Sequence, residues 1–126
     1  MTTHPYHALI IDDDEFLLDM YAVKFRESGF SVDVAPSASD AMERIKNGLS
    51  ADVILLDLVM PGMDGLEFLR TLKTAKMLPD AKIIILTNLG QKEDVDKGLR
   101  MGAADYVIKA HHTPSEVVKK VQEILK

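Results

Sequence analysis

The eight residues Leu9-Ile10-Ile11-Asp12-Asp13-Asp14-Glu15-Phe16 join a short apolar run to four consecutive acids. Three large aliphatic residues in a row favour a buried strand, whereas acids are favoured in the first turn of a helix, whose dipole stabilises negative charge. Asp14 and Glu15 fit such a helix start. Asp12 and Asp13 stand where the strand should still be ending, and neighbouring carboxylates repel one another there. The stretch therefore predicts a strand, a crowded acidic turn and a helix.

Four more apolar segments along the chain have the length of a strand. Several of them are continuous runs of Val, Ile and Leu rather than alternating patterns, which is typical of parallel strands covered by helices on both faces. The predicted strands are Ala8–Ile11, Val32–Ala35, Val53–Leu56, Lys82–Leu86 and Ala104–Ile108.

The segments between these strands have apolar residues at helical spacing, and several have capping signals at their ends. Gly29 and Gly48 are placed to end the first two helices, and Ser37-x-x-Asp40 and Thr113-Pro114-x-Glu116 are placed to begin the second and the last. The predicted inward-facing residues are Leu17, Met20, Tyr21 and Phe25; Ala38, Ala41, Met42 and Ile45; Leu66, Leu69 and Leu72; and Val117, Val118, Val121, Ile124 and Leu125.

The fourth predicted helix, Gln91–Arg100, has the weakest pattern. Val95 and Leu99 are its only clear apolar anchors, and Gly98 lowers its helix propensity. A weakly anchored helix is a candidate moving part.

Strands and helices thus alternate five times, which predicts an α/β fold with a doubly wound, five-stranded parallel sheet. The 126 residues are expected to form one domain, and with 47% hydrophobic residues they can bury a core. A net charge of −5 and the lack of a basic cluster disfavour nucleic-acid binding by this domain. The apolar runs are too short to span a bilayer, and Met1–His7 lacks the apolar core of a signal peptide, so a cytoplasmic location is expected.

Polar residues gather after the strands, and in open parallel sheets ligands bind beyond the carboxyl ends of the strands. Asp12 and Asp13 follow the first strand, Asp57 the third, Thr87 the fourth and Lys109 the fifth. Three carboxylates, one hydroxyl and one ammonium are therefore expected at one edge of the sheet. Carboxylates crowded in this way are stabilised by a cation, and Mg²⁺ prefers oxygen ligands and often binds carboxylates beside a phosphate. Because aspartate can accept a phosphoryl group covalently, the set suggests phosphoryl transfer.

These motifs, in this order, resemble the receiver domain of response regulators in two-component signalling, over the whole of residues 1–126. The resemblance rests on Asp12-Asp13, on the stretch Asp57-Leu-Val-Met-Pro-Gly-Met-Asp-Gly65, on Thr87 and on Tyr106-Val-Ile-Lys109. It implies a flavodoxin-like strand order of 2-1-3-4-5. It also implies a signalling phosphoacceptor rather than an enzyme, with only limited catalysis of its own phosphorylation and dephosphorylation.

The resemblance implies a role for each matching residue. Asp57 would accept the phosphoryl group from a phosphohistidine of a histidine kinase or phosphotransfer protein. Asp13, Asp57 and the backbone carbonyl of Val59 would bind Mg²⁺ or Mn²⁺, with Asp12 acting mostly through water. Lys109 and Thr87 would contact phosphoryl oxygens, and Tyr106 would swing inward when Thr87 moves.

The resemblance also implies an output surface, formed by the fourth helix, the fifth strand and the last helix. Through it the domain would act on a downstream protein target or a fused output domain. The mixed charges on this surface are compatible with a homodimer, although surface charge is weak evidence for one.

Four positions depart from the family pattern. Ala110 replaces the usual proline after Lys109, and a cis Lys109–Ala110 bond is predicted, although a non-proline cis bond costs about 3–4 kcal/mol. Asn88 stands where a smaller residue is usual and is expected to narrow access or to add a hydrogen bond. Val59 and Leu89 are apolar at positions that tune the attack of water on the acyl phosphate, so slow self-dephosphorylation is expected.

Two other functions fit parts of the sequence. A phosphatase of the haloacid-dehalogenase type would use an aspartyl-phosphate, but it would have its nucleophile after the first strand, in an Asp-x-Asp pattern. A constitutive interaction domain that no longer accepts phosphate is the second alternative, and Asn88 and Ala110 leave room for it.

Overall fold

The computed structural model describes residues 6–60, 62–88 and 91–126, which form a five-stranded parallel sheet in the order β2-β1-β3-β4-β5. The predicted fold and strand order are confirmed. The strands are β1 (His7–Ile11), β2 (Ser31–Ala35), β3 (Val53–Asp57), β4 (Lys82–Thr87) and β5 (Asp105–Ile108). The helices are α1 (Glu15–Glu27), α2 (Ala38–Lys46), α3 (Gly65–Thr74), α4 (Lys92–Arg100) and α5 (Pro114–Leu125), and a short 3₁₀ turn covers Lys109–His111.

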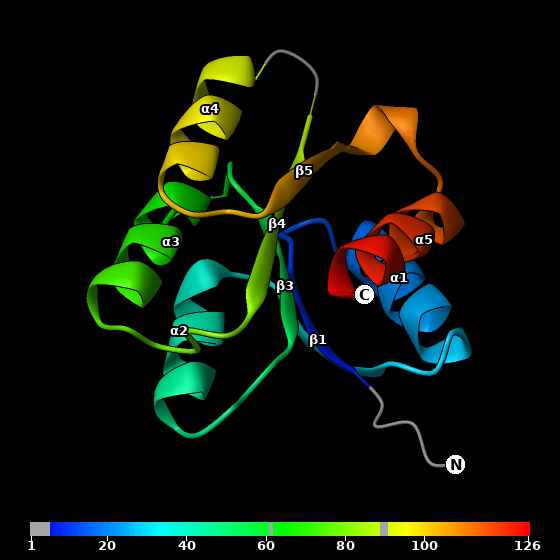
Figure 1. Cartoon of the computed structure of the whole chain (residues 1–126), viewed down its shortest axis with the longest axis horizontal. Helices are drawn as coiled ribbons and strands as arrows, with labels where there is room; N and C mark the ends of the chain where they lie inside the picture. Colours follow the sequence, from blue (N-terminus) through cyan, green and yellow to red (C-terminus); the bar gives the residue numbers. More distant parts are fainter. Residues whose placement is uncertain (1–5, 61, 89–90) are drawn as a thin grey trace.

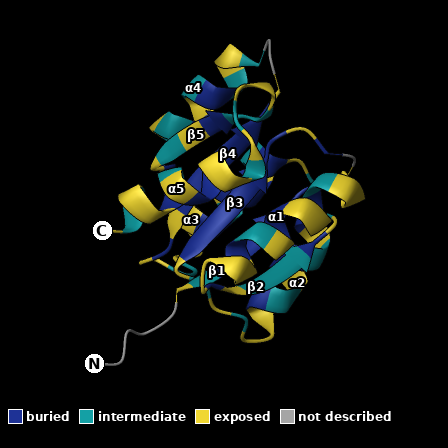
Figure 2. Cartoon of the chain, turned by 90° about the vertical axis from the view of Figure 1, so that its right-hand side faces the viewer, coloured by how far each residue is buried: buried dark blue, intermediate teal, exposed yellow. Residues whose placement is uncertain are grey.

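The helices cover both faces of the sheet (Figure 1). Helices α2, α3 and α4 lie on one side, and α1 and α5 lie on the other. Successive residues of β1 show why both layers form: Leu9 and Ile11 pack into the first layer, whereas Ala8 and Ile10 pack into the second. Strand β3 is buried along its whole length and lies in the middle of the molecule (Figure 2). Because a central strand is covered on both faces, its sequence does not alternate between polar and apolar residues.

Local signals set the helix starts as predicted. Ser37 accepts a hydrogen bond from the backbone N–H of Asp40, and Thr113 and Glu116 form a reciprocal capping box at the start of α5. Gly29 and Gly48 follow α1 and α2 with positive φ angles, which glycine adopts without steric cost.

Two predicted helix faces are partly wrong. In α1, Met20 is 36% exposed, and the face that packs on the sheet includes Leu18 and Ala22 beside Tyr21 and Phe25. In α3, Phe68 is buried, whereas Leu66 is only partly buried. Both helices carry more apolar residues than one face can hold, so spacing alone did not decide which of them point inward.

The weak anchoring of α4 is present in the structure. Val95 is its one buried apolar side chain, and Leu99 is half-buried against the same layer. Gly98 is buried, and a Cβ atom there would lie 2.4 Å from Cδ1 of Ile85, so with a larger residue either the Ile85 side chain or the helix would have to shift. Gly98 therefore allows a close approach between α4 and the sheet at the cost of helix propensity.

Within residues 6–60, 62–88 and 91–126, no helix is long and apolar enough to cross a membrane.

Candidate phosphoacceptor and metal site

Two buried carboxylates lie at the carboxyl edge of the sheet. Asp57 is the last residue of β3 and Asp12 directly follows β1, and they are 2% and 0% exposed. Backbone amides orient both: Asp12 Oδ1 accepts a hydrogen bond from Asp14 N at 2.9 Å, and Asp57 Oδ1 accepts one from Val59 N at 3.2 Å. Strands β1 and β3 are neighbours in parallel, so their ends bring the two side chains together.

Asp13 completes an acidic cluster with these two residues. One carboxylate oxygen from each of Asp12, Asp13 and Asp57 lies within 4.8 Å of the others, and Asp13 is the exposed member. Oδ2 of Asp12 is buried, and among the described residues only the ammonium of Lys109 pairs with it. A set of three converging carboxylates with one open to solvent fits a hard divalent cation that keeps several of its waters.

Lys109 provides the positive charge in this pocket. Its Nζ lies 2.7 Å from Oδ2 of Asp12 and 3.4 Å from Oδ2 of Asp57, and its side chain is 9% exposed. Burial by itself would lower the pKa of Lys109, but the close contact with Asp12 and the charges of the two aspartates outweigh burial and raise that pKa. Lys109 is therefore held in its charged form.

The predicted cis bond between Lys109 and Ala110 is wrong. The described residues contain no cis peptide bond, and the chain enters a 3₁₀ turn at Lys109. With a trans bond, Lys109 still contacts both aspartates. The turn thus directs the side chain into the pocket without the cost of a non-proline cis bond.

The pocket disfavours the charged form of the Asp57 side chain. Burial and the charge of Asp12 raise its pKa from 3.8 to about 6, against the opposing effects of Lys109 and the Val59 N–H. The carboxylate is still mostly ionised at neutral pH. An added cation would offset both the burial of the charged carboxylate and its repulsion by Asp12, which is a second reason why the cluster suits a metal ion.

The loop after Asp57 packs closely against α3. Gly65 donates a backbone hydrogen bond to Leu58 O at 2.9 Å, and a Cβ atom at Gly65 would lie 2.4 Å from Asp57 O. Asp64 caps α3 by accepting a hydrogen bond from Glu67 N at 2.8 Å. The Asp64-Gly65 pair therefore holds the start of α3 against the end of β3 and limits the movement of Asp57. The sequence alone did not predict this packing role of Gly65.

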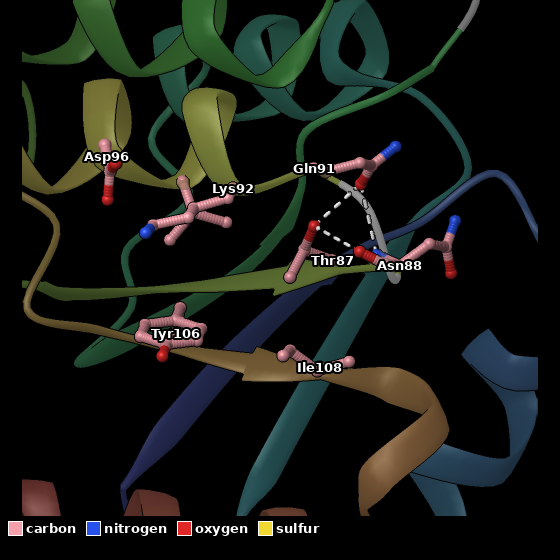
Figure 3. A pocket seen from close by; sticks show the side chains of 8 residues that line it. Thr87, Asn88, Gln91, Lys92, Asp96, Tyr106 and Ile108 are labelled. Carbon is pink, nitrogen blue, oxygen red and sulfur yellow. Dashed lines mark hydrogen bonds between the residues drawn. The ribbon is translucent and has the colours of Figure 1, made fainter.

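Thr87 ends β4 at the same edge, but its hydroxyl is engaged on the side of α4. Its shortest contact is to Oε1 of Gln91 at 2.7 Å, with the Asn88 carbonyl oxygen at 3.2 Å, and the backbone N–H of Asn88 donates to the same Gln91 oxygen at 3.1 Å (Figure 3). The backbone of Asn88 thus adds a hydrogen bond, whereas its side chain is exposed. The sequence contains no signal for this role of Gln91, because nothing in the pattern shows that a residue before a helix reaches back to the strand.

Tyr106 lies on β5 and is 37% exposed. It lines a cavity of about 250 Å³ together with Thr87, Gln91 and Val95, between the sheet and α4. Leu89 lies outside the described residues, and Val59 is 50% exposed beside Asp57.

The family model of the response regulator receiver domain matches residues 8–122. The chain belongs to this receiver family. The DNA-binding response regulator MtrA of Mycolicibacterium smegmatis is 36% identical over 126 residues, which are 100% of this chain and 53% of MtrA. The chain therefore spans about half the length of that relative.

Solved receiver structures have the same fold as this chain. A receiver domain protein from Methanospirillum hungatei is 28% identical, with a TM-score of 0.86 over 97% of this chain and 94% of that one. A BeF₃-activated DrrB receiver domain is 27% identical, with a TM-score of 0.82 over 97% and 98% of the two chains. Membership in the receiver family makes this chain a signalling domain, and its acidic pocket lies at the carboxyl edge of the sheet.

Proposed function

We propose that this receiver is a phosphorylation-controlled switch in which Asp57 accepts a phosphoryl group from a phosphohistidine. The observation that carries the proposal is the pairing of a buried, ionised carboxylate with Lys109 inside a three-carboxylate cluster. A carboxylate oxygen of Asp57 attacks phosphorus, an O–P bond forms, and the P–N bond breaks with its electron pair going to the imidazole nitrogen. The phosphatase alternative loses support, because Lys109 and the cluster lie beside Asp57 at the end of β3, whereas that class has its nucleophile after the first strand.

The surrounding residues stabilise the charge that the phosphoryl group brings. Lys109 is close enough to Asp57 to pair with a phosphoryl oxygen, and Thr87 can donate its hydroxyl to another after it leaves Gln91. Asp12, Asp13 and Asp57, with the Val59 carbonyl, would hold Mg²⁺ or Mn²⁺. Such an ion neutralises phosphoryl charge when bound. The role of the Val59 carbonyl stays a prediction.

The output surface is proposed to be α4, β5 and α5. The exposed Tyr106 and the cavity beside Thr87 give the ring space to move inward once Thr87 turns toward Asp57. Phosphorylation would bias an equilibrium between the two arrangements and so change what this surface binds. The binding partner would be a downstream protein or an output domain, and a homodimer through this surface also stays a prediction.

The direct test is phosphorylation by acetyl phosphate, read by intact mass. With Mg²⁺, the chain is expected to gain the mass of one phosphoryl group, and peptide mapping should locate that group on Asp57. With EDTA in place of Mg²⁺, the gain should be lost. A chain that stays unmodified with Mg²⁺ would support the alternative of a constitutive interaction domain.

An exposed apolar strip on α1 indicates that the phosphodonor is a protein. Phe16, Met20 and Val23 are 72%, 36% and 51% exposed, and their spacing places them on one side of the helix. Phe16 lies in the first turn of α1, four residues after Asp12. A contiguous exposed apolar strip beside a reaction centre is typical of a protein-docking surface.

Replacing Phe16 by alanine is expected to slow phosphotransfer from a protein donor by about tenfold, the effect of losing an apolar anchor from an interface. Phosphorylation by acetyl phosphate should be unchanged, because that donor is too small to contact α1. Since Phe16 is largely exposed, stability should change little. Equal losses with both donors would argue against docking through α1.

The phosphorylated form is expected to be long-lived, because apolar Val59 and Leu89 provide no group to orient an attacking water. The double variant Val59→Asn, Leu89→Glu should release phosphate at least about tenfold faster in a time course. The matched variant Val59→Ala, Leu89→Ala also removes both apolar side chains but adds no polar group, and it should change the rate less. A lifetime of seconds for the parent protein would refute slow release.

A further inference from the structure

Gln91 occupies an unusual position at the start of α4. As the residue before the helix it could cap the helix amides, but its side chain makes no capping hydrogen bond. It reaches back to β4 instead, where Oε1 accepts from the Thr87 hydroxyl at 2.7 Å and from the Asn88 backbone N–H at 3.1 Å. Figure 3 shows the Thr87 and Gln91 side chains pointing toward one another. One amide oxygen therefore joins the end of the strand to the start of the helix.

These two bonds matter because few side chains hold this helix. Val95 is the one buried apolar side chain of α4, Leu99 is half-buried and Gly98 packs on Ile85, and the Gln91 contacts add polar bonds between the start of the helix and the end of β4. Thr87 is 1% exposed, and its hydroxyl lies 2.7 Å from Oε1 of Gln91 but 3.2 Å from the Asn88 carbonyl oxygen, so Gln91 offers the shorter of its two hydrogen bonds. The bond to Gln91 consequently stabilises one orientation of Thr87.

A hydroxyl has a single proton to donate. Thr87 can give it to Gln91 or to a phosphoryl oxygen on Asp57, but not to both. We propose that Gln91 is a positioning residue that holds Thr87 and the start of α4 in the unphosphorylated arrangement, and so sets how readily phosphorylation shifts the domain to the other arrangement. The proposal rests on the proposed function. Beyond that function, it assigns Gln91 the role of releasing the start of α4 when Thr87 turns toward the phosphoryl group.

The test compares Mg²⁺-dependent binding of beryllofluoride, a phosphoryl mimic, by the parent chain and by Gln91→Met. Methionine has nearly the same length and helix propensity but offers no oxygen acceptor. Without the competing acceptor, the midpoint of a beryllofluoride titration followed by NMR should fall by about twofold to tenfold, as expected for one lost hydrogen bond. Before any beryllofluoride is added, the Asn88 amide hydrogen of the variant should also exchange faster than that of the parent.

Two further variants separate this role from a general effect on α4. In a Thr87→Val background the hydroxyl is absent, so Gln91→Met should lose more than half of its effect on the midpoint. Gln91→Glu keeps an acceptor at Oε1 and should not tighten binding. Glu93→Gln, an exposed change in the first turn of α4, should leave the parental midpoint unchanged.

The outcomes are distinguishable. A parent chain that does not bind beryllofluoride with Mg²⁺ would overturn the proposed function and this coupling with it. Binding by the parent with no change in Gln91→Met, or an equal effect of Gln91→Met in the parent and in the Thr87→Val background, would overturn the role of Gln91 alone.

Discussion

Replacing Asp57 by asparagine is expected to abolish phosphorylation of this receiver by both acetyl phosphate and a phosphohistidine donor. The amide cannot act as the nucleophile, and no other described carboxylate combines burial beside Lys109 with a place at the end of β3. Asp12 is also buried and paired with Lys109, but it follows β1, whereas the resemblance to receiver domains assigns the phosphoacceptor to the residue at the end of the third strand. We expect labelling below the detection limit of a radiolabel or intact-mass assay.

The matched control is Asp64→Asn, which lies in the same loop and removes one exposed carboxylate. Asparagine caps helices as well as aspartate does, so α3 should keep its start and the variant should fold like the parent protein. Asp64→Asn is expected to be labelled at the parental rate. If Asp57→Asn were labelled as readily as Asp64→Asn, the phosphoacceptor assignment would be wrong.

The second large effect is on stability and depends on pH. Burial first, and then the charge of Asp12, raise the pKa of Asp57 to about 6 in the folded chain, above the value of 3.8 for a free side chain. A carboxyl group with a raised pKa stabilises the fold fully below pH 3.8, and this contribution is lost as the pH rises through about 6. Asparagine does not titrate. Asp57→Asn should therefore gain stability relative to the parent protein as the pH rises.

The size of this change follows from the shift in pKa. A shift of this size corresponds to about 3 kcal/mol between the acid limit and neutral pH. Roughly half of it falls between pH 5 and pH 7.5, where both proteins can be compared by urea unfolding in EDTA. Asp64→Asn again controls for the removal of one negative charge. A stability difference between Asp57→Asn and the parent that does not vary with pH would contradict the raised pKa.

Magnesium should reduce the stability difference between Asp57→Asn and the parent protein. A cation bound by the three carboxylates stabilises the folded parent according to its concentration and affinity. Asp57→Asn lacks one ligand and should gain less. Adding Mg²⁺ at pH 7.5 is therefore expected to narrow the stability gap between the two proteins. An unchanged gap at millimolar Mg²⁺ would argue against a metal site formed by Asp12, Asp13 and Asp57.

Much of the fold could be predicted because its signals are local or periodic. The Ser37 cap and the Thr113–Glu116 capping box involve residues three positions apart, so they are visible in the sequence. Runs such as Val53–Leu56 required burial on both faces, which led to parallel strands between helical layers. Placing Asp12, Asp57 and Lys109 at one edge then followed from the shared direction of the strands.

Other features depended on distances that no pattern contains. Met20 was predicted to face inward, but α1 packs through Leu18 and Ala22. The cis bond at Ala110 was predicted from the need to aim Lys109, and a 3₁₀ turn aims it with a trans bond. Gly98 was interpreted as weakening α4, whereas in the structure it allows close contact with Ile85.

By itself the sequence determined the five-fold alternation of strand and helix, the parallel sheet and the acids and lysine at its carboxyl edge, because periodicity and chain direction suffice for these. Only the tertiary structure decided which partners those side chains have: Lys109 with two aspartates, and Thr87 with Gln91 rather than toward Asp57. The reason is that a hydrogen bond needs two atoms within about 3 Å, and the packing of α4 on the sheet sets that separation.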